Sequence, residues 1–85
     1  MSKRPDEQTE FGLRALVQLA AARDVLVPTG ELAGAIPGRV LEAVMTRLRR
    51  AGLVRGVRGP EGGFQLARSA DQISLADIVA AMTGL

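Results

Sequence analysis

The stretch from Gly38 to Arg68, GRVLEAVMTRLRRAGLVRGVRGPEGGFQLAR, contains both patterns on which the fold prediction rests. Its first half has apolar residues at the spacing of one helix face, which is typical of an amphipathic helix packed on a core. The residues of this stripe are Val40, Leu41, Val44, Met45 and Leu48. Gly52 follows the stripe, and glycine readily takes the left-handed conformation that ends a helix. We therefore predict a helix over about residues 38–51.

The second half of the stretch predicts a β-hairpin. Two short runs rich in strand-forming residues, about 53–58 and 64–68, flank the loop Gly59-Pro60-Glu61-Gly62-Gly63. Arg58 stands at the shoulder of this glycine-rich loop. We expect the hairpin, over about residues 53–68, to project from the domain as a wing.

A short helix and a tight turn are predicted before the amphipathic helix. Thr29 is a suitable N-cap for a helix that reaches about Ala35, with Leu32 and Ala33 facing inward. Pro37 fits the first position of the next helix, because its missing N–H is not needed there. Two helices joined in this way ahead of a hairpin predict a winged helix-turn-helix, a mainly α fold with a small antiparallel β-hairpin.

Helices are also predicted near both ends of the sequence. The first covers about residues 6–22 and includes Gly12, which costs about 1 kcal/mol relative to alanine and is best explained by close packing. The last begins at Ser74, with Asp77 three residues on as in a capping box. The apolar residues expected to pack it onto the domain are Leu75, Ile78, Val79 and Met82.

These elements predict a single domain over residues 1–85, with the helix-turn-helix at about 29–51. Residues 25–27, closed by Pro28, predict a very short strand that would extend the hairpin to a three-stranded sheet. The sequence contains no internal repeat, linker or low-complexity tract.

The composition excludes several classes of function. The 85 residues include neither cysteine nor histidine, which excludes disulfides, thiolate or imidazole metal ligands and the commonest catalytic bases. We therefore expect neither enzyme activity nor a cofactor. No apolar run is long enough to span a membrane, and the first residues lack the apolar core of a signal peptide. A soluble, cytoplasmic protein is expected.

The charges are unevenly distributed along the sequence. Residues 39–68 hold seven arginines against Glu42 and Glu61, a local net charge of +5 inside a chain whose total is +2. A basic centre between acidic ends indicates a face for an anionic partner. An arginine-rich surface that is merely solvated is the alternative.

The wing sequence Val57-Arg58-Gly59-Pro60-Glu61-Gly62-Gly63-Phe64 resembles the V-R-G-P-G-G-G-Y wing of the IscR/NsrR-type (Rrf2) family of bacterial regulators. Three further segments fit the same family in the same order: residues 9–16, 48–54 and 73–79. The resemblance implies sequence-specific binding of duplex DNA by a transcriptional regulator, with a repressor and a homodimer expected. It also implies that the third helix lies in the major groove and Arg58 in the minor groove.

The residues expected to contact DNA come from both helices of the motif and from the wing. The third helix offers Arg39 to guanine or phosphate and Glu42 to a cytosine amino group, with Ala43 able to touch a thymine methyl. The full set of candidates is Thr29, Arg39, Glu42, Ala43, Thr46, Arg47, Arg58, Gly59, Pro60, Gly62 and Gly63. Further backbone contacts are proposed for Lys3, Arg4 and Arg55.

The sequence departs from the family pattern in ways that keep a second function open. Members usually carry a further C-terminal stretch with iron–sulfur cysteines and a long dimerisation helix, and no cluster is expected within these 85 residues. The turn before the third helix is about two residues shorter than usual, Glu61 replaces a wing glycine, and Ala43 replaces a polar residue. The alternative function is a protein-binding adaptor or antirepressor. A substitute dimer surface would use Leu13, Val17, Leu75, Val79 and Met82.

Overall fold

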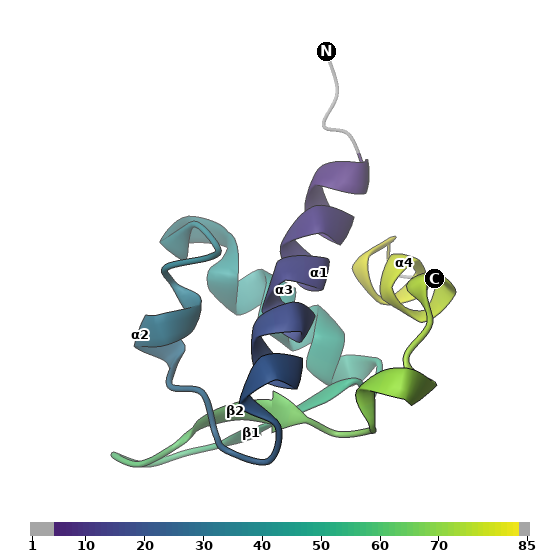
Figure 1. Cartoon of the computed structure of the whole chain (residues 1–85). Coiled ribbons are helices and arrows are strands. Elements are labelled where there is room, and N and C mark those ends of the chain that lie inside the picture. Colours follow the sequence, from purple (N-terminus) through teal and green to yellow (C-terminus); the bar gives the residue numbers. More distant parts are fainter. Residues whose placement is uncertain (1–4, 84–85) are drawn as a thin grey trace.

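The computed structural model describes residues 5–83 (Figure 1). Its elements, in order, are α1 (Pro5–Ala22), α2 (Thr29–Leu32), α3 (Gly38–Arg50), β1 (Val54–Val57), β2 (Gly63–Leu66), the short 3-10 helix η1 (Ala70–Gln72) and α4 (Leu75–Thr83). Helices α2 and α3 precede an antiparallel hairpin, and α1 and α4 pack against α3. This arrangement is the predicted winged helix-turn-helix.

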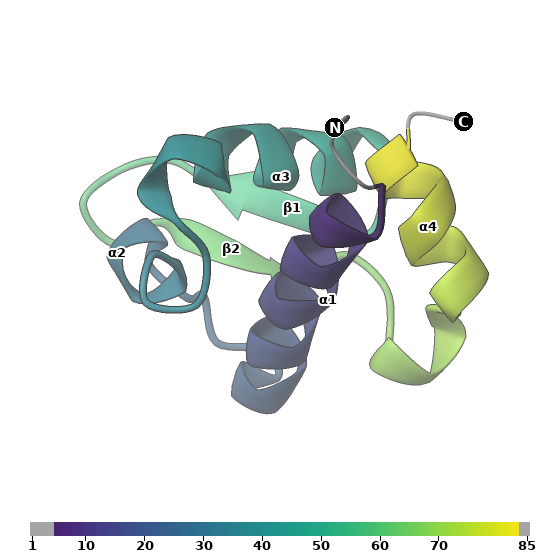
Figure 2. The same ribbon diagram turned by 90° about the horizontal axis from the view of Figure 1, so that it is seen from above.

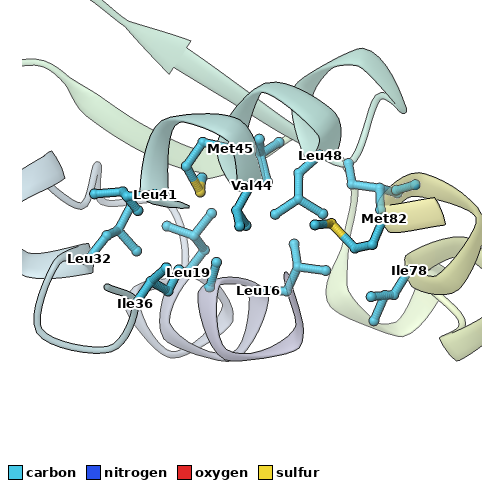
Figure 3. Packing of buried hydrophobic residues seen from close by; sticks show 14 of the residues in the cluster. Leu16, Leu19, Leu32, Ile36, Leu41, Val44, Met45, Leu48, Ile78 and Met82 are labelled. Atoms are coloured by element: carbon cyan, nitrogen blue, oxygen red, sulfur yellow. The ribbon is translucent and has the colours of Figure 1, made fainter. Parts of the chain in front are cut away.

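The core lies between α1, α3 and α4 (Figure 3). The α3 stripe is buried as predicted at four of its five positions, and Val40 is half-buried. Leu48 of α3 and Leu19 of α1 are fully buried, and each such side chain stabilises the fold by about 1.5–3 kcal/mol relative to an exposed one. The apolar face of α3 is therefore fixed against the core, and its opposite face is left to solvent.

The end of α3 sets the position of the hairpin. Gly52 has a φ of 78°, in the left-handed region predicted for it. The Gly52 N–H donates to the Arg49 carbonyl (2.9 Å) and the Leu53 N–H to the Leu48 carbonyl (3.0 Å), which is the Schellman pattern. The reversal buries Leu53 and Val54 in the core, so β1 begins directly against α3.

The predicted third strand is reduced to one residue pair. β1 and β2 pair antiparallel, with Val54 opposite Leu66 and Val57 opposite Gly63. Val27 forms a single bridge with Phe64, through N–H···O bonds of 2.8 and 2.9 Å. The ladder does not extend past this pair, because the next residue that would bond to β2, Thr29, already begins α2.

The start and end of α2 differ from the prediction. Thr29 is the first residue of the helix, and Pro28 is its N-cap, with no side-chain capping hydrogen bond. The prediction of Thr29 as N-cap was therefore wrong: the Pro28 carbonyl already accepts from Glu31 N–H (3.0 Å). The helix ends at Leu32, and the turn after it exposes Ala33 and buries Ile36 instead. The N–H groups of Ala35 and Ile36 both donate to the Leu32 carbonyl, and these two hydrogen bonds stabilise the turn.

Pro37 also takes a different place from the one predicted. It is the N-cap of α3, one residue before the helix, and its carbonyl accepts from the Val40 N–H (3.0 Å). Its extended backbone, with φ −54° and ψ 135°, lies outside the helical region, so the helix begins at Gly38.

The close packing predicted at Gly12 is present, and it occurs between α1 and α4. A Cβ placed there would lie 2.9 Å from both Cγ and Sδ of Met82. Met82 and Ile78 are buried, as predicted, but Leu75 and Val79 are 64% and 39% exposed. Leu75 and Val79 share a helical stripe about 60–100° round from Ile78, beside the buried face rather than on it.

The predicted capping box at the start of α4 is present. Ser74 N–H donates to Asp77 Oδ2 (2.9 Å), and Asp77 N–H donates to Ser74 Oγ (3.0 Å). Hydrogen bonding to the carboxylate, first from the Ser74 backbone N–H and then from the Ser74 hydroxyl, holds the pKa of Asp77 below its usual value. A carboxyl with a lowered folded-state pKa stabilises the fold above its unfolded pKa, and this contribution is lost as pH falls through the folded one.

We expect Asp77→Asn to weaken the acid sensitivity of the fold. As the pH falls below about 4, the melting temperature of the wild type should fall more steeply than that of the variant, because only the wild type loses a charged cap there. Thermal melts followed by circular dichroism across this range make the comparison. Parallel curves for the two proteins would contradict the role given to Asp77.

Candidate nucleic-acid interface

The outer face of α3 presents the residues predicted to read DNA. Arg39, Glu42 and Ala43 are exposed, and Thr46 is half-buried. They lie opposite the buried stripe of the same helix, so core packing fixes their direction. In Figure 2, α3 runs along one side of the molecule, with the hairpin beside it and α4 at its C-terminal end.

Two hollows flank α3, one on each side. The hollow between α3 and α4 has a volume of about 740 Å³, and the one between α3 and the wing about 530 Å³. Glu42 and Thr46 line both. Helix α3 therefore forms a ridge with a groove along each flank.

Arginines line both hollows. Those on the α4 side are Arg39, Arg47 and Arg50, and those on the wing side are Arg49 and Arg58. The acidic side chain lining each hollow is Glu42, on the ridge between them. The ion pair seen among the described residues is formed by Arg14 and Glu10, which both lie on α1. The arginines beside α3 are thus not neutralised by a carboxylate of the described chain, and both flanks of the ridge are positive.

Arg47 is engaged within the protein. Its Nη1 donates to the carbonyl of Met82 near the C-terminal end of α4 (3.1 Å). A cation at this end of a helix is favoured by the helix dipole. Arg47 therefore joins α3 to α4, in addition to lining the hollow where a DNA contact was predicted.

The wing tip exposes Arg58 beside a tight turn. The Gly62 N–H donates to the Gly59 carbonyl (3.0 Å), which leaves Pro60 and Glu61 exposed at the centre of the turn. No hydrogen bond or ion pair of Arg58 to another described residue is seen. The guanidinium is free to contact a ligand.

The three wing glycines predicted to approach DNA have different structural reasons. Gly59 has a φ of 109°, and a Cβ there would point into open space. A Cβ at Gly62 would overlap the Val57 carbonyl, and one at Gly63 would overlap the Val27 carbonyl. Gly62 is therefore required by the backbone of the wing itself and Gly63 by the backbone of Val27, while Gly59 leaves its outer side unobstructed.

The structure adds Arg49 to the candidate site. It lines the wing-side hollow together with Thr29 at the start of α2 and Arg58 of the wing. This residue was not predicted from the sequence, although its spacing from Glu42 indicates its position. Arg49 follows Glu42 by seven residues, about two helical turns, which places both on the same side of α3.

Other predicted backbone contacts are not brought to either hollow. Arg55 Nε donates to Gln65 Oε1 (3.0 Å), and Gln65 Nε2 donates to the Asp24 carbonyl (2.9 Å). These bonds hold Arg55 on the side of the hairpin that meets the end of α1. Lys3 and Arg4 lie outside the described residues.

None of the helices within residues 5–83 combines the length and the apolar character needed to cross a membrane. Nor does this part of the chain gather three or more acidic, histidine or cysteine side chains in an arrangement that would hold a metal ion.

Comparison with known proteins assigns nearly the whole chain to one group. A family model described as "Rrf2: Iron-dependent Transcriptional regulator" matches residues 6–85. The HTH-type transcriptional regulator IscR of Cereibacter sphaeroides is 42% identical over 77 residues, covering 85% of this chain and 50% of that protein. Rv1287 of Mycobacterium tuberculosis, named as an HTH-type transcriptional regulator only provisionally, is 44% identical over 84 residues, covering 95% and 52%. The chain thus spans about half the length of these relatives.

Solved structures share the same fold. CymR of B. subtilis, described as its global cysteine regulator, superposes with a TM-score of 0.85 at 28% identity, covering all of this chain and 67% of CymR. IscR of T. potens gives a TM-score of 0.81 at 30% identity, covering 95% of this chain and 60% of that one. These similarities confirm the winged helix-turn-helix arrangement.

Proposed function

The chain belongs to the Rrf2 family of transcriptional regulators, and from this premise we propose that residues 1–85 form one unit that binds duplex DNA sequence-specifically. The observation that carries the proposal is the ridge of α3 between two arginine-lined hollows. A major groove about 12 Å wide admits one α-helix, with a phosphate strand along each side of it. Base-reading groups on the ridge and cations on both flanks match that arrangement.

On the ridge, we assign base contacts to the exposed residues of α3. Arg39 binds a guanine edge or a phosphate, Glu42 accepts from a cytosine amino group, and Ala43 touches a thymine methyl. Thr46 and Arg47 lie one turn further along and contact the DNA backbone. Arg47 does so while its Nη1 remains bound to α4, through its other donors.

At the wing, Arg58 enters the adjacent minor groove, where the negative potential is strongest. Gly59 and Pro60 lie against the sugar–phosphate backbone. Gly62 and Gly63 support this contact by permitting the tight turn. Thr29 contacts a backbone phosphate from the start of α2.

We further propose that the protein is bacterial, cytoplasmic and without enzyme activity. We propose that it acts as a repressor, since a protein bound at a promoter excludes polymerase. A homodimer would place two such units on a near-palindromic site. Its surface is the apolar region of α1 and α4 that includes Leu13, Val17, Leu75 and Val79, all exposed. Met82 does not belong to this surface, because it is buried against Gly12. Sedimentation equilibrium at micromolar concentration, with a fitted mass of one chain, would argue against the dimer.

The proposed function is tested by the salt dependence of binding to genomic duplex fragments. Neutralisation of phosphates releases counterions, so the logarithm of the affinity should fall linearly as the logarithm of the salt concentration rises. Tight binding at low salt with such a slope would support a DNA-binding regulator. A folded protein that binds no duplex even at low salt would instead point to a protein-binding adaptor or antirepressor.

Glu42→Gln should change which sequences are bound more than how tightly DNA is bound. The carboxylate can only accept hydrogen bonds, whereas the amide also donates them, so a preference for cytosine should relax. Selection from random duplexes with the wild type and the variant gives the two preferences. Identical selected sequences would remove Glu42 from base recognition.

A further inference from the structure

The hollow between α3 and the wing continues along the hairpin. The 530 Å³ hollow beside α3 and a second one of about 390 Å³ beside the wing share four lining residues. These are Thr29, Arg49, Arg58 and Phe64. A single channel thus runs between the recognition helix and the hairpin, with Arg49 on one wall and Arg58 on the other.

The geometry of duplex DNA assigns an occupant to this channel. A major groove and its neighbouring minor groove are separated by one sugar–phosphate strand. If α3 lies in the first groove and Arg58 in the second, that strand has to cross the space between α3 and the wing. This step rests on the proposed function, and it follows from the placement of the two elements rather than from any base contact.

We propose that the channel between α3 and the wing seats this strand, with the Arg49 guanidinium as the principal ligand of one phosphodiester and the Thr29 hydroxyl as a second donor. Arg49 is exposed, and its side chain is not seen to hydrogen-bond or pair with another described residue. Its fork of donors matches phosphate oxygens. The seat fixes the register of the protein on DNA and carries no sequence information.

The width of the channel is set before DNA arrives. The Schellman bonds after α3 hold β1 against the helix, because Leu53 and Val54 are buried there. On the hairpin side, the Phe64 ring packs over Gly56, where a Cβ would lie 3.0 Å from Phe64 Cε1. The ring forms an apolar surface of the channel that suits the deoxyribose between two phosphates. Preorganisation of this kind lowers the cost of binding.

The test compares Arg49→Gln with the matched control Arg23→Gln. Both variants lose one positive charge, and Arg23 lies past the end of α1, which points away from α3 in Figure 2. For Arg49→Gln we expect an affinity at least fivefold lower on every duplex, and a salt slope smaller by about 0.9, the value for one phosphate. Arg23→Gln should leave both quantities unchanged. Arg49→Lys should restore the slope with only part of the affinity, since the charge returns without the fork.

The outcomes separate the seat from the proposed function. If Arg49→Gln bound DNA with the affinity and salt slope of the wild type, the proposed phosphate contact of Arg49 would be overturned and DNA binding would stand. A loss confined to some sequences would overturn it as well, since Arg49 would then be a base reader. If the wild-type protein bound no duplex, both the phosphate contact and the proposed function would be overturned. A second variant, Thr29→Val, should lower the affinity about twofold or more with the slope kept, because a neutral donor is removed; an unchanged affinity would overturn the role of the hydroxyl.

Discussion

Arg58→Ala is expected to weaken binding to duplex DNA more than tenfold while leaving the melting temperature nearly unchanged. The side chain is exposed at the shoulder of the wing and is not seen to hydrogen-bond or pair with another described residue, so its removal costs the fold little. Its loss from a narrow minor groove removes a cation from the site of strongest negative potential. Titration of a fluorescent duplex at a fixed salt concentration measures the change.

Two controls keep this expectation specific. Arg23→Ala removes the same charge from the turn after α1 and should bind as the wild type does, so a similar loss in that variant would mean that only net charge matters. Thermal melts of Arg58→Ala check that the wing is intact. An unchanged affinity would remove the wing from the mechanism, and a large fall in melting temperature would show that Arg58 is structural instead.

The second large effect is expected for Gly63→Ala, on stability. Gly63 has a φ of 154°, and its missing side chain leaves room for the carbonyl of Val27. A methyl group there would collide with backbone that cannot move without breaking the bridge between Val27 and Phe64. Overpacking and backbone strain together should cost about 2–4 kcal/mol, which lowers the melting temperature of a domain of this size by about 8–32 °C.

Gly30→Ala is the matched control for this substitution. It makes the same chemical change inside α2, where a Cβ would meet nothing within 4 Å. Because alanine favours a helix more than glycine does, this variant should melt at or above the wild-type temperature. Equal melting temperatures for Gly63→Ala and the wild type would show that the wing turn has another conformation.

The elements predicted best are those defined by short-range patterns. The period of Leu41, Val44 and Leu48 gave α3 and its buried face, because a helix places every third or fourth residue on one side. Gly52 gave its end, and the glycines of the wing gave the turn, because few other residues adopt those backbone angles. Ser74 and Asp77 marked the start of α4 by a hydrogen-bond pattern within four residues.

Predictions that depended on the path of the chain between elements or on distant partners were less accurate. Thr29 has the chemistry of an N-cap, but the chain enters α2 through Pro28, whose carbonyl takes that place. Leu75 and Val79 are as apolar as Ile78, and only the packing of α4 on Gly12 of α1 decides which of them is covered.

For the candidate site, the sequence by itself determined the ridge of α3, the positive charge around it and the exposed arginine of the wing. The tertiary structure alone decided how those charges are used. It directs Arg47 to the carbonyl of Met82, 35 residues away in sequence, and brings Arg49 opposite Arg58 across a channel. The physical reason is that a helical period fixes the direction of a side chain relative to its own helix, whereas its partner depends on how separate elements pack, and that is set by the whole core.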